Sequence, residues 1–194
     1  SSNRRQRQMC IRDSRYLTAG GAGKEFAQPM YVNTPYGISL AHNGNLTNST
    51  NLASELFHAE KRHINTNSDS EVLLNIFALE LSKQDAVYPQ AQDFFAAVQK
   101  THMRINGAYA VITVIAGHGL LAFRDPLGIS PLIIGERQGK RRKEYVIASE
   151  NALFTSLGFK TVRNVLPGEA IFIDNDGNLH SQQCFDTVSY THLT

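Results

Sequence analysis

Short apolar runs and amphipathic segments alternate along the chain from Tyr36 onward. The run Ile38–Ala41 predicts a strand, and the polar letters HNGN at residues 42–45 predict a turn at its end. Apolar residues then recur at helical spacing in three stretches. The first half of this pattern therefore predicts one strand followed by helices.

The three predicted helices begin and end at recognisable residues. Ser49 or Thr50 is expected to cap the first, which carries Leu52, Leu56 and Phe57. Ser68 is expected to cap the second, whose apolar positions are Val72, Leu73, Ile76, Phe77 and Leu81. Each has one apolar stripe and is expected to cover a sheet. The third is predicted from about Ala91 to His102, with Gly107 as its stop.

After Gly107 the pattern changes to strands. Three pairs of apolar runs are each joined by a polar or glycine-containing loop, namely 109–116 with 119–123, 132–135 with 145–148, and 170–173 with 179–183. A short helix, Asn151–Leu157, is expected between the second and third pairs. Helices gathered early and strands gathered late favour an α+β fold with antiparallel sheets over a doubly wound parallel sheet.

Composition narrows the class of protein. A chain of 194 residues, 42% of them hydrophobic, suits one globular domain, and no apolar stretch is long enough to span a bilayer. The formal charge of +2 comes from four arginines within residues 1–14, so the remaining chain is slightly acidic. We therefore expect neither a nucleic-acid partner nor a membrane partner.

The two cysteines, Cys10 and Cys184, are too few for a disulfide framework, which favours a reducing, cytoplasmic location. The histidines show no metal-site spacing, so no metal is expected. Residues 1–14 and 188–194 lack any pattern, and we interpret both as tails that could be sequencing artefacts. The domain is expected to occupy residues 15–187.

Three short segments could carry chemistry: RYLTAG from Arg15, LAHNGNLTN from Leu40, and TNSDSE from Thr66. Taken singly, each is explained by a surface arginine, a turn and a helix cap. Together with AQP at 27–29, FRDPLGISPL at 123–132, ASE at 148–150 and PGE at 167–169, they resemble the class II, N-terminal-nucleophile glutamine amidotransferases. The resemblance is strongest to the branch that uses a phosphoribosyl diphosphate acceptor, and it runs from Arg15 to about Cys184.

This resemblance implies a four-layer αββα sandwich, here incomplete, that binds glutamine where its two antiparallel sheets open. Arg15 matches the family arginine that binds the α-carboxylate of glutamine, for which a guanidinium fork is well suited. Thr18 matches a neighbour that lines the pocket, and Asp69 matches the carboxylate that receives the α-ammonium. Together, the opposite charges of Arg15 and Asp69 would select free glutamine over glutamine within a peptide.

The resemblance also implies an oxyanion hole formed by the Asn43 side chain and the backbone N–H of Gly44. Both would donate hydrogen bonds to the amide oxygen as the carbon becomes tetrahedral. Glycine at position 44 is expected because a side chain would crowd an amide that faces the substrate.

The sequence departs from the family pattern in three places. The family nucleophile is a cysteine at the mature N-terminus, several dozen residues before the RYxTAG segment, whereas Cys10 lies only five residues before Arg15 and is not expected to act. Ser130 stands where the family usually has arginine, which leaves the role of its loop open. Nothing resembles a phosphoribosyltransferase domain, which is the expected partner in the full protein.

We therefore expect the chain to be the glutaminase part of an enzyme that supplies ammonia, inactive as it stands. No cofactor is expected here, Mg²⁺ being needed only by the missing phosphoribosyltransferase domain, and the full protein is expected to be a homo-oligomer. Two alternatives stay open: a class II amidotransferase with another acceptor, and a non-catalytic glutamine-binding module.

Overall fold

The computed structural model describes residues 27–84, 86–140 and 142–185, which form three helices and nine strands. The helices are α1 (Ser49–His58), α2 (Asp69–Ser82) and α3 (Ala91–His102). The strands are β1 (Met30–Val32), β2 (Ile38–Leu46), β3 (Gly107–Ile115), β4 (Gly119–Arg124), β5 (Ile133–Gln138), β6 (Lys143–Ala148), β7 (Lys160–Asn164), β8 (Glu169–Asp174) and β9 (Leu179–Gln183).

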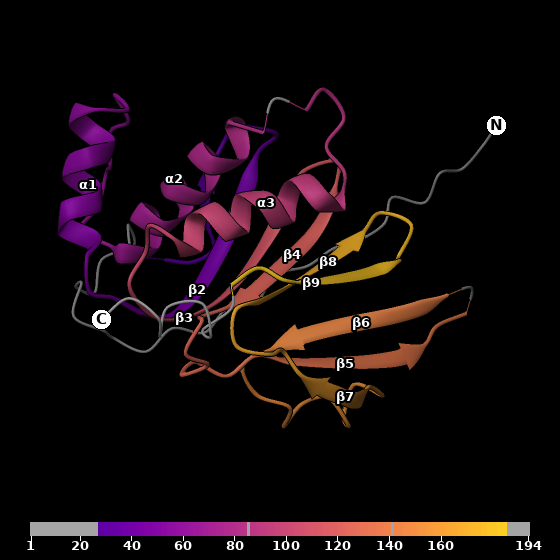
Figure 1. Cartoon of the computed structure of the whole chain (residues 1–194). Coiled ribbons are helices and arrows are strands. Elements are labelled where there is room, and N and C mark those ends of the chain that lie inside the picture. The colour runs from indigo at the N-terminus through magenta and orange to yellow at the C-terminus, as the bar shows by residue number, and fades with distance from the viewer. Residues whose placement is uncertain (1–26, 85, 141, 186–194) are drawn as a thin grey trace, which may run out of the picture.

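The strands form two antiparallel sheets, which confirms the predicted α+β class. The larger sheet has the order β1-β2-β3-β4-β8-β9, and the smaller has the order β6-β5-β7. Figure 1 shows the three helices on one side of the larger sheet and the smaller sheet on the other side. The described residues thus supply three of the four expected layers, and a second helical layer is not among them.

Each face of the larger sheet has its own core because successive side chains of a strand point to opposite faces. Toward the helices, Tyr109, Val111 and Phe123 join a large apolar cluster with α2 and α3. Toward the smaller sheet, Ala110, Ala122 and Ile171 pack with Leu132, Ile134 and Val165. The middle layer is therefore covered on both sides.

Helix α2 is more deeply buried than its predicted single stripe suggests. Every residue from Ser70 to Leu81 is buried, so the predicted single stripe was wrong, although the helix covers the sheet as predicted. The cause is its neighbourhood: α2 packs against α1, α3 and the strands β1 and β2. The predicted cap is confirmed, because the Ser68 side chain accepts a hydrogen bond from the backbone N–H of Ser70.

The ends of α1 and α3 differ in part from expectation. Asn48, rather than Ser49 or Thr50, is the N-cap residue of α1; its side chain binds backbone groups of Arg104 and Asn106 instead of capping the helix. Leu52 and Leu56 are buried as expected, but Phe57 is 54% exposed. Helix α3 has the predicted bounds, yet Gly107 is the first residue of β3 and not the helix stop.

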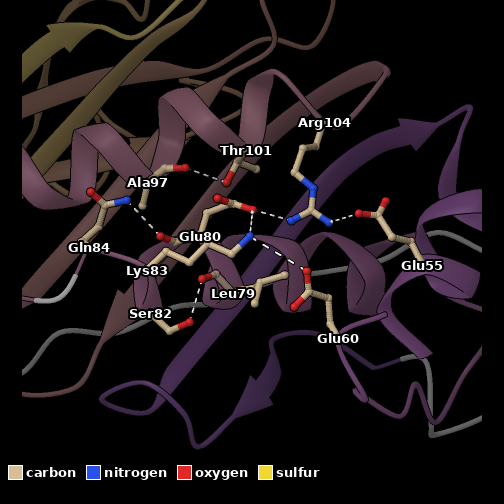
Figure 2. A network of polar contacts seen from close by, with 10 residues as sticks. All are labelled: Glu55, Glu60, Leu79, Glu80, Ser82, Lys83, Gln84, Ala97, Thr101 and Arg104. Atoms are coloured by element: carbon tan, nitrogen blue, oxygen red, sulfur yellow. Dashed lines mark hydrogen bonds and ion pairs between the residues drawn. The ribbon is translucent and has the colours of Figure 1, made fainter. Parts of the chain in front are cut away.

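Polar side chains tie the helices together where α1, α2 and α3 meet. Figure 2 shows the Arg104 guanidinium between the carboxylates of Glu80 and Glu55, with Lys83 bound to Glu80 and near Glu60. Glu80 is buried, so its two cationic partners offset the cost of removing a carboxylate from water. No helix in the described parts of the chain is long and apolar enough to cross a membrane.

The predicted strand pairs at 109–123 and 170–183 are confirmed, and β5 and β6 extend further into their loop than predicted. The polar letters HNGN belong to β2 and not to a turn. The predicted helix at 151–157 is wrong: residues 152–158 form successive turns, and Phe154 is the one buried residue among them. The short strands β1 and β7 were not predicted.

Candidate active site

Asn43 lies on β2, on the face that the larger sheet turns toward the smaller sheet. It pairs with Ala110 of β3, and directly paired residues of an antiparallel sheet share a face. Ala110 belongs to the core between the sheets, whereas Asn43 lies outside that core and is exposed. The Asn43 Nδ2 donates a hydrogen bond to Ser149 Oγ at 3.2 Å, just after the end of β6. The side chain amide is thus accessible and held between the two sheets.

Gly44 is required by the strand pairing itself. Its φ is +148°, and a Cβ built there would lie 2.0 Å from the backbone oxygen of Ala108 on β3. Both facts favour glycine. The structure thus adds a reason for glycine, because the backbone of the neighbouring strand fills the space of a side chain, and crowding of an amide that faces the substrate stays a prediction.

Asp69 is the first residue of α2 and reaches the end of β2. Its Oδ2 accepts the backbone N–H of Leu46 at 3.0 Å, and its Oδ1 accepts Ser70 Oγ at 3.4 Å. The side chain keeps 19% of its surface exposed. A carboxylate in the first turn is favoured by the helix dipole, and its remaining lone pairs could accept further donors.

Behind Asn43, on the helix side of the sheet, a small polar cluster is buried. His42 pairs with Val111, a residue of the core beneath the helices, and its Nδ1 lies 3.1 Å from Ser70 Oγ. Gln28 accepts the backbone N–H of His42 at 2.6 Å and donates to Ser70 Oγ at 3.1 Å. Sequence reasoning missed the contacts of Gln28 and Ser70.

Glu71 fixes the loop that leads into α2. Its two carboxylate oxygens accept four hydrogen bonds from the backbone and side chains of Asn65 and Thr66. Burial by itself would raise the pKa of Glu71, but these hydrogen bonds outweigh it, and the pKa is lowered from its ordinary value. The start of α2, and with it Asp69, is therefore anchored by a buried carboxylate that stays ionised.

The loop that contains Ser130 is held through backbone groups. Asp125 is fully buried and accepts the N–H groups of Ile129 and Ser130, while the Arg124 guanidinium donates to the carbonyls of Gly128, Ser130 and Val165. The loop therefore folds without a side-chain partner from position 130.

The remaining predicted site residues, Arg15 and Thr18, lie outside the described residues, as does Cys10. Cys184 is buried in the core beneath the helices, and burial raises the pKa of its thiol to about 12. It is therefore a packed core residue and not a reactive thiolate.

A cavity of about 450 Å³ lies between α1 and residues 63–67, and neither Asn43 nor Asp69 lines it. Within the described ranges no three His, Cys, Asp or Glu side chains gather in a way that could hold a metal ion.

The fold, with an exposed asparagine on β2 and an aspartate at the start of α2 that binds the end of that strand, belongs to a known class. The chain is a member of the glutamine amidotransferase domain family, whose model matches residues 19–156. This confirms the family indicated by the sequence motifs.

Within that family the chain is similar to amidophosphoribosyltransferases. It is 52% identical to the one from Escherichia coli K12 over 184 residues and 50% identical to the one from Pseudomonas aeruginosa over 176 residues. These matches cover 94% and 91% of this chain but 36% and 35% of the relatives. The chain therefore spans about a third of the length of these relatives.

Solved structures agree with this assignment. The glutamine phosphoribosylpyrophosphate amidotransferase of B. subtilis, in complex with ADP and GMP, matches with a TM-score of 0.70 and 30% identity over 89% of this chain and 34% of its own. A glutamine amidotransferase from Pseudomonas aeruginosa, at 15% identity and a TM-score of 0.55, shares the fold alone.

Proposed function

We propose that residues 15–187 are the glutamine-binding part of the glutaminase domain of an amidophosphoribosyltransferase. The complete enzyme would hydrolyse glutamine to glutamate and pass the ammonia to phosphoribosyl diphosphate, an early step of purine biosynthesis in the cytoplasm. A fused phosphoribosyltransferase domain with Mg²⁺ and a homo-oligomeric assembly belong to this proposal. The observation that carries it is the placement of Asn43 and Asp69 at one end of β2, in a chain 52% identical to such an enzyme.

In this proposal Asp69 binds the α-ammonium of glutamine and Arg15 binds its α-carboxylate, with Thr18 beside them. A supporting fact is the partial exposure of the Asp69 carboxylate at the start of α2. Its two acceptor oxygens are oriented by Leu46 and Ser70, so the carboxylate is held in place before a ligand arrives.

The chemistry proposed for Asn43 and Gly44 follows from where negative charge develops. In the complete enzyme the family's N-terminal cysteine adds to the side-chain amide carbon of glutamine, and the carbonyl oxygen becomes an oxyanion. The Asn43 Nδ2, which now donates to Ser149 Oγ, and the Gly44 N–H would donate to that oxygen. The amide nitrogen leaves as ammonia, and water releases glutamate from the acyl enzyme.

A chimera can test these roles. Residues 15–184 would replace the matching segment of the E. coli enzyme, so that the host provides the nucleophile and the acceptor domain. We expect Asn43→Ala to lower kcat with glutamine about 10²- to 10³-fold. Asp69→Ala and Arg15→Ala should raise the KM for glutamine strongly, because each removes a charge that binds one end of the substrate. Activity with free ammonia should persist in all three.

The control is Asn51→Ala, the same change at an exposed position of α1, which should leave glutamine kinetics unchanged. Steady-state assays with glutamine and with ammonia give the comparison. Glutamine kinetics that stay at the wild-type level in Asn43→Ala and Asp69→Ala would refute the proposed function.

A further inference from the structure

The Gln28 side chain connects the two elements that carry the proposed glutamine contacts. Its Oε1 accepts the backbone N–H of His42, the residue directly before Asn43. Its Nε2 donates to Ser70 Oγ, on the residue directly after Asp69. We propose that Gln28 is a positioning residue, which sets the spacing between Asn43 and Asp69 without touching the substrate. This inference rests on the proposed function.

The strand geometry explains why a side chain is needed at this point. Strand β1 pairs with β2 from Val32 opposite Ile38 to Met30 opposite Leu40, where the pairing ends. Gln28 lies two residues before Met30, and His42 lies two residues after Leu40, so both are just beyond the paired segment. There the Gln28 side chain, and not its backbone, receives the N–H of His42. The glutamine amide thus continues the support of β2 beyond the last paired residue of β1.

The second contact fixes the start of α2. Ser70 is buried, and its hydroxyl contacts Gln28 Nε2, His42 Nδ1 and Asp69 Oδ1. A hydroxyl has one proton to donate and two lone pairs to accept with. The Gln28 amide can only donate through its nitrogen, so it occupies one of those lone pairs and leaves the hydroxyl proton for His42 or Asp69. The orientation of Ser70, and hence of the Asp69 carboxylate beside it, follows from this donor.

The position of Gln28 suits a role in the reaction more than a role in folding. It is half-buried and lies outside the apolar core clusters. Its two contacts are with His42 and Ser70, the chain neighbours of Asn43 and Asp69, which are proposed to bind opposite ends of the substrate. A displacement of about 1 Å between a substrate and its catalytic contacts can cost on the order of 10²-fold in rate. We expect loss of Gln28 to lower kcat/KM for glutamine about 10- to 100-fold, mainly through kcat.

Gln28→Met tests this in the chimera, because it keeps the length of the side chain and removes both hydrogen bonds. The matched control is Gln84→Met, since the Gln84 amide donates to the Glu80 carbonyl within the helical layer. Ammonia-dependent activity and the thermal midpoint of Gln28→Met should equal those of Gln84→Met. Ser70→Ala removes the other end of the contact, and Gln28→Met should cost less in that background than in the wild type.

The outcomes separate this inference from the proposed function. If Gln28→Met matches Gln84→Met with glutamine while Asp69→Ala does not use glutamine, the positioning role is wrong and the proposed function stands. If Gln28→Met loses ammonia-dependent and glutamine-dependent activity equally, the role is structural and the inference is overturned. Additive effects of Gln28→Met and Ser70→Ala would also overturn it. Wild-type glutamine kinetics in Asn43→Ala and Asp69→Ala would instead reject the function itself.

Discussion

Single polar side chains hold the loops on either side of the proposed glutamine contacts. Glu71 is the clearest case, because one buried carboxylate satisfies two backbone N–H groups and two side-chain donors of the 65–66 segment. A charged acceptor forms stronger hydrogen bonds than a neutral one. The path of the chain from α1 to α2 therefore depends on the ionised state of one residue.

Replacing Glu71 with glutamine should destabilise the fold. An amide in place of the carboxylate would point an N–H₂ group at donors of Thr66, so we expect a loss of about 1–3 kcal/mol in the free energy of unfolding at pH 7. Urea unfolding of the 194-residue chain measures it. Glu144→Gln, which breaks an exposed ion pair with Arg137, is the control and should cost at most about 1 kcal/mol.

The same residue predicts a response to acid. The lowered pKa of Glu71 means that the stability this residue adds is fully present above pH 4.5, the ordinary pKa of the carboxyl. That stability is lost as the pH falls below this value. Glu71→Gln should therefore flatten the pH dependence of the free energy of unfolding in that acidic range. An unchanged slope would contradict the ionised state of Glu71.

At the scale of elements, β2 and β3 leave no room for a side chain at two positions near the end that carries Asn43. Gly44 on β2 and Gly107 on β3 have φ values of +148° and +145°. A Cβ on either one would lie within 2.2 Å of a backbone oxygen of the opposite strand. Glycine at both positions is thus a condition of the pairing, and the pairing sets the position of Asn43.

Gly44→Ala should therefore be far more costly than an alanine at another glycine of positive φ. The left-handed conformation alone costs a non-glycine residue about 1–2 kcal/mol, and here a clash with Ala108 is added. Gly117→Ala is the matched control, because Gly117 has φ +81° and nothing within 4 Å of the added Cβ. The denaturant midpoint of Gly44→Ala should be clearly lower than that of Gly117→Ala. Equal midpoints would mean that the added Cβ does not meet the backbone of Ala108.

Elements with a strong local pattern could be predicted from the sequence. The cap at Ser68, the bounds of α3 and the hairpin of β3 and β4 follow from local signals. Strand β1 has three residues and owes its form to pairing with β2, so its own sequence contains no signal for it. The same holds for HNGN: Asn-Gly usually indicates a turn, and the partner strand decides otherwise.

The site was predictable only where a family motif marks it. Asn43, Gly44 and Asp69 stand in recognisable segments, but Gln28, Ser70 and Ser149 act through contacts with residues distant in sequence. No periodicity or spacing joins position 43 to position 149. The contact of Ser149 exists only once the two sheets are face to face, and that of Gln28 with Ser70 only once α2 has packed on the larger sheet.

At the scale of the whole molecule, the core beneath the helices contains a polar pair far from the proposed substrate contacts in sequence. His102 and Tyr109 are buried, and their Nδ1 and hydroxyl lie 2.7 Å apart. Burial lowers the pKa of His102 to about 4, although the nearby Asp125 opposes this shift. The imidazole is therefore neutral in the folded protein near neutral pH.

This histidine predicts that the fold weakens in mild acid. The pKa of His102 is lower in the folded than in the unfolded chain. Its contribution to the free energy of unfolding is therefore complete above pH 6.5 and declines as the pH falls to about 4. The loss over this range should reach about 3 kcal/mol. His102→Gln should remove most of that slope in urea unfolding series, while His63→Gln at an exposed position should keep it. A slope that survives His102→Gln would contradict the buried neutral state.

The alternation of β2 between two covered faces has one more consequence, which concerns how this segment can change in evolution. His42 points to the helices and Asn43 to the smaller sheet, so neighbouring codons serve opposite sides of the same layer. Gain or loss of a single residue between positions 38 and 42 would exchange the two side chains, placing the imidazole on the side of the proposed substrate contacts and the amide beside Ser70 under the helices. Substitutions can be sampled along this stretch one at a time, but its length is fixed.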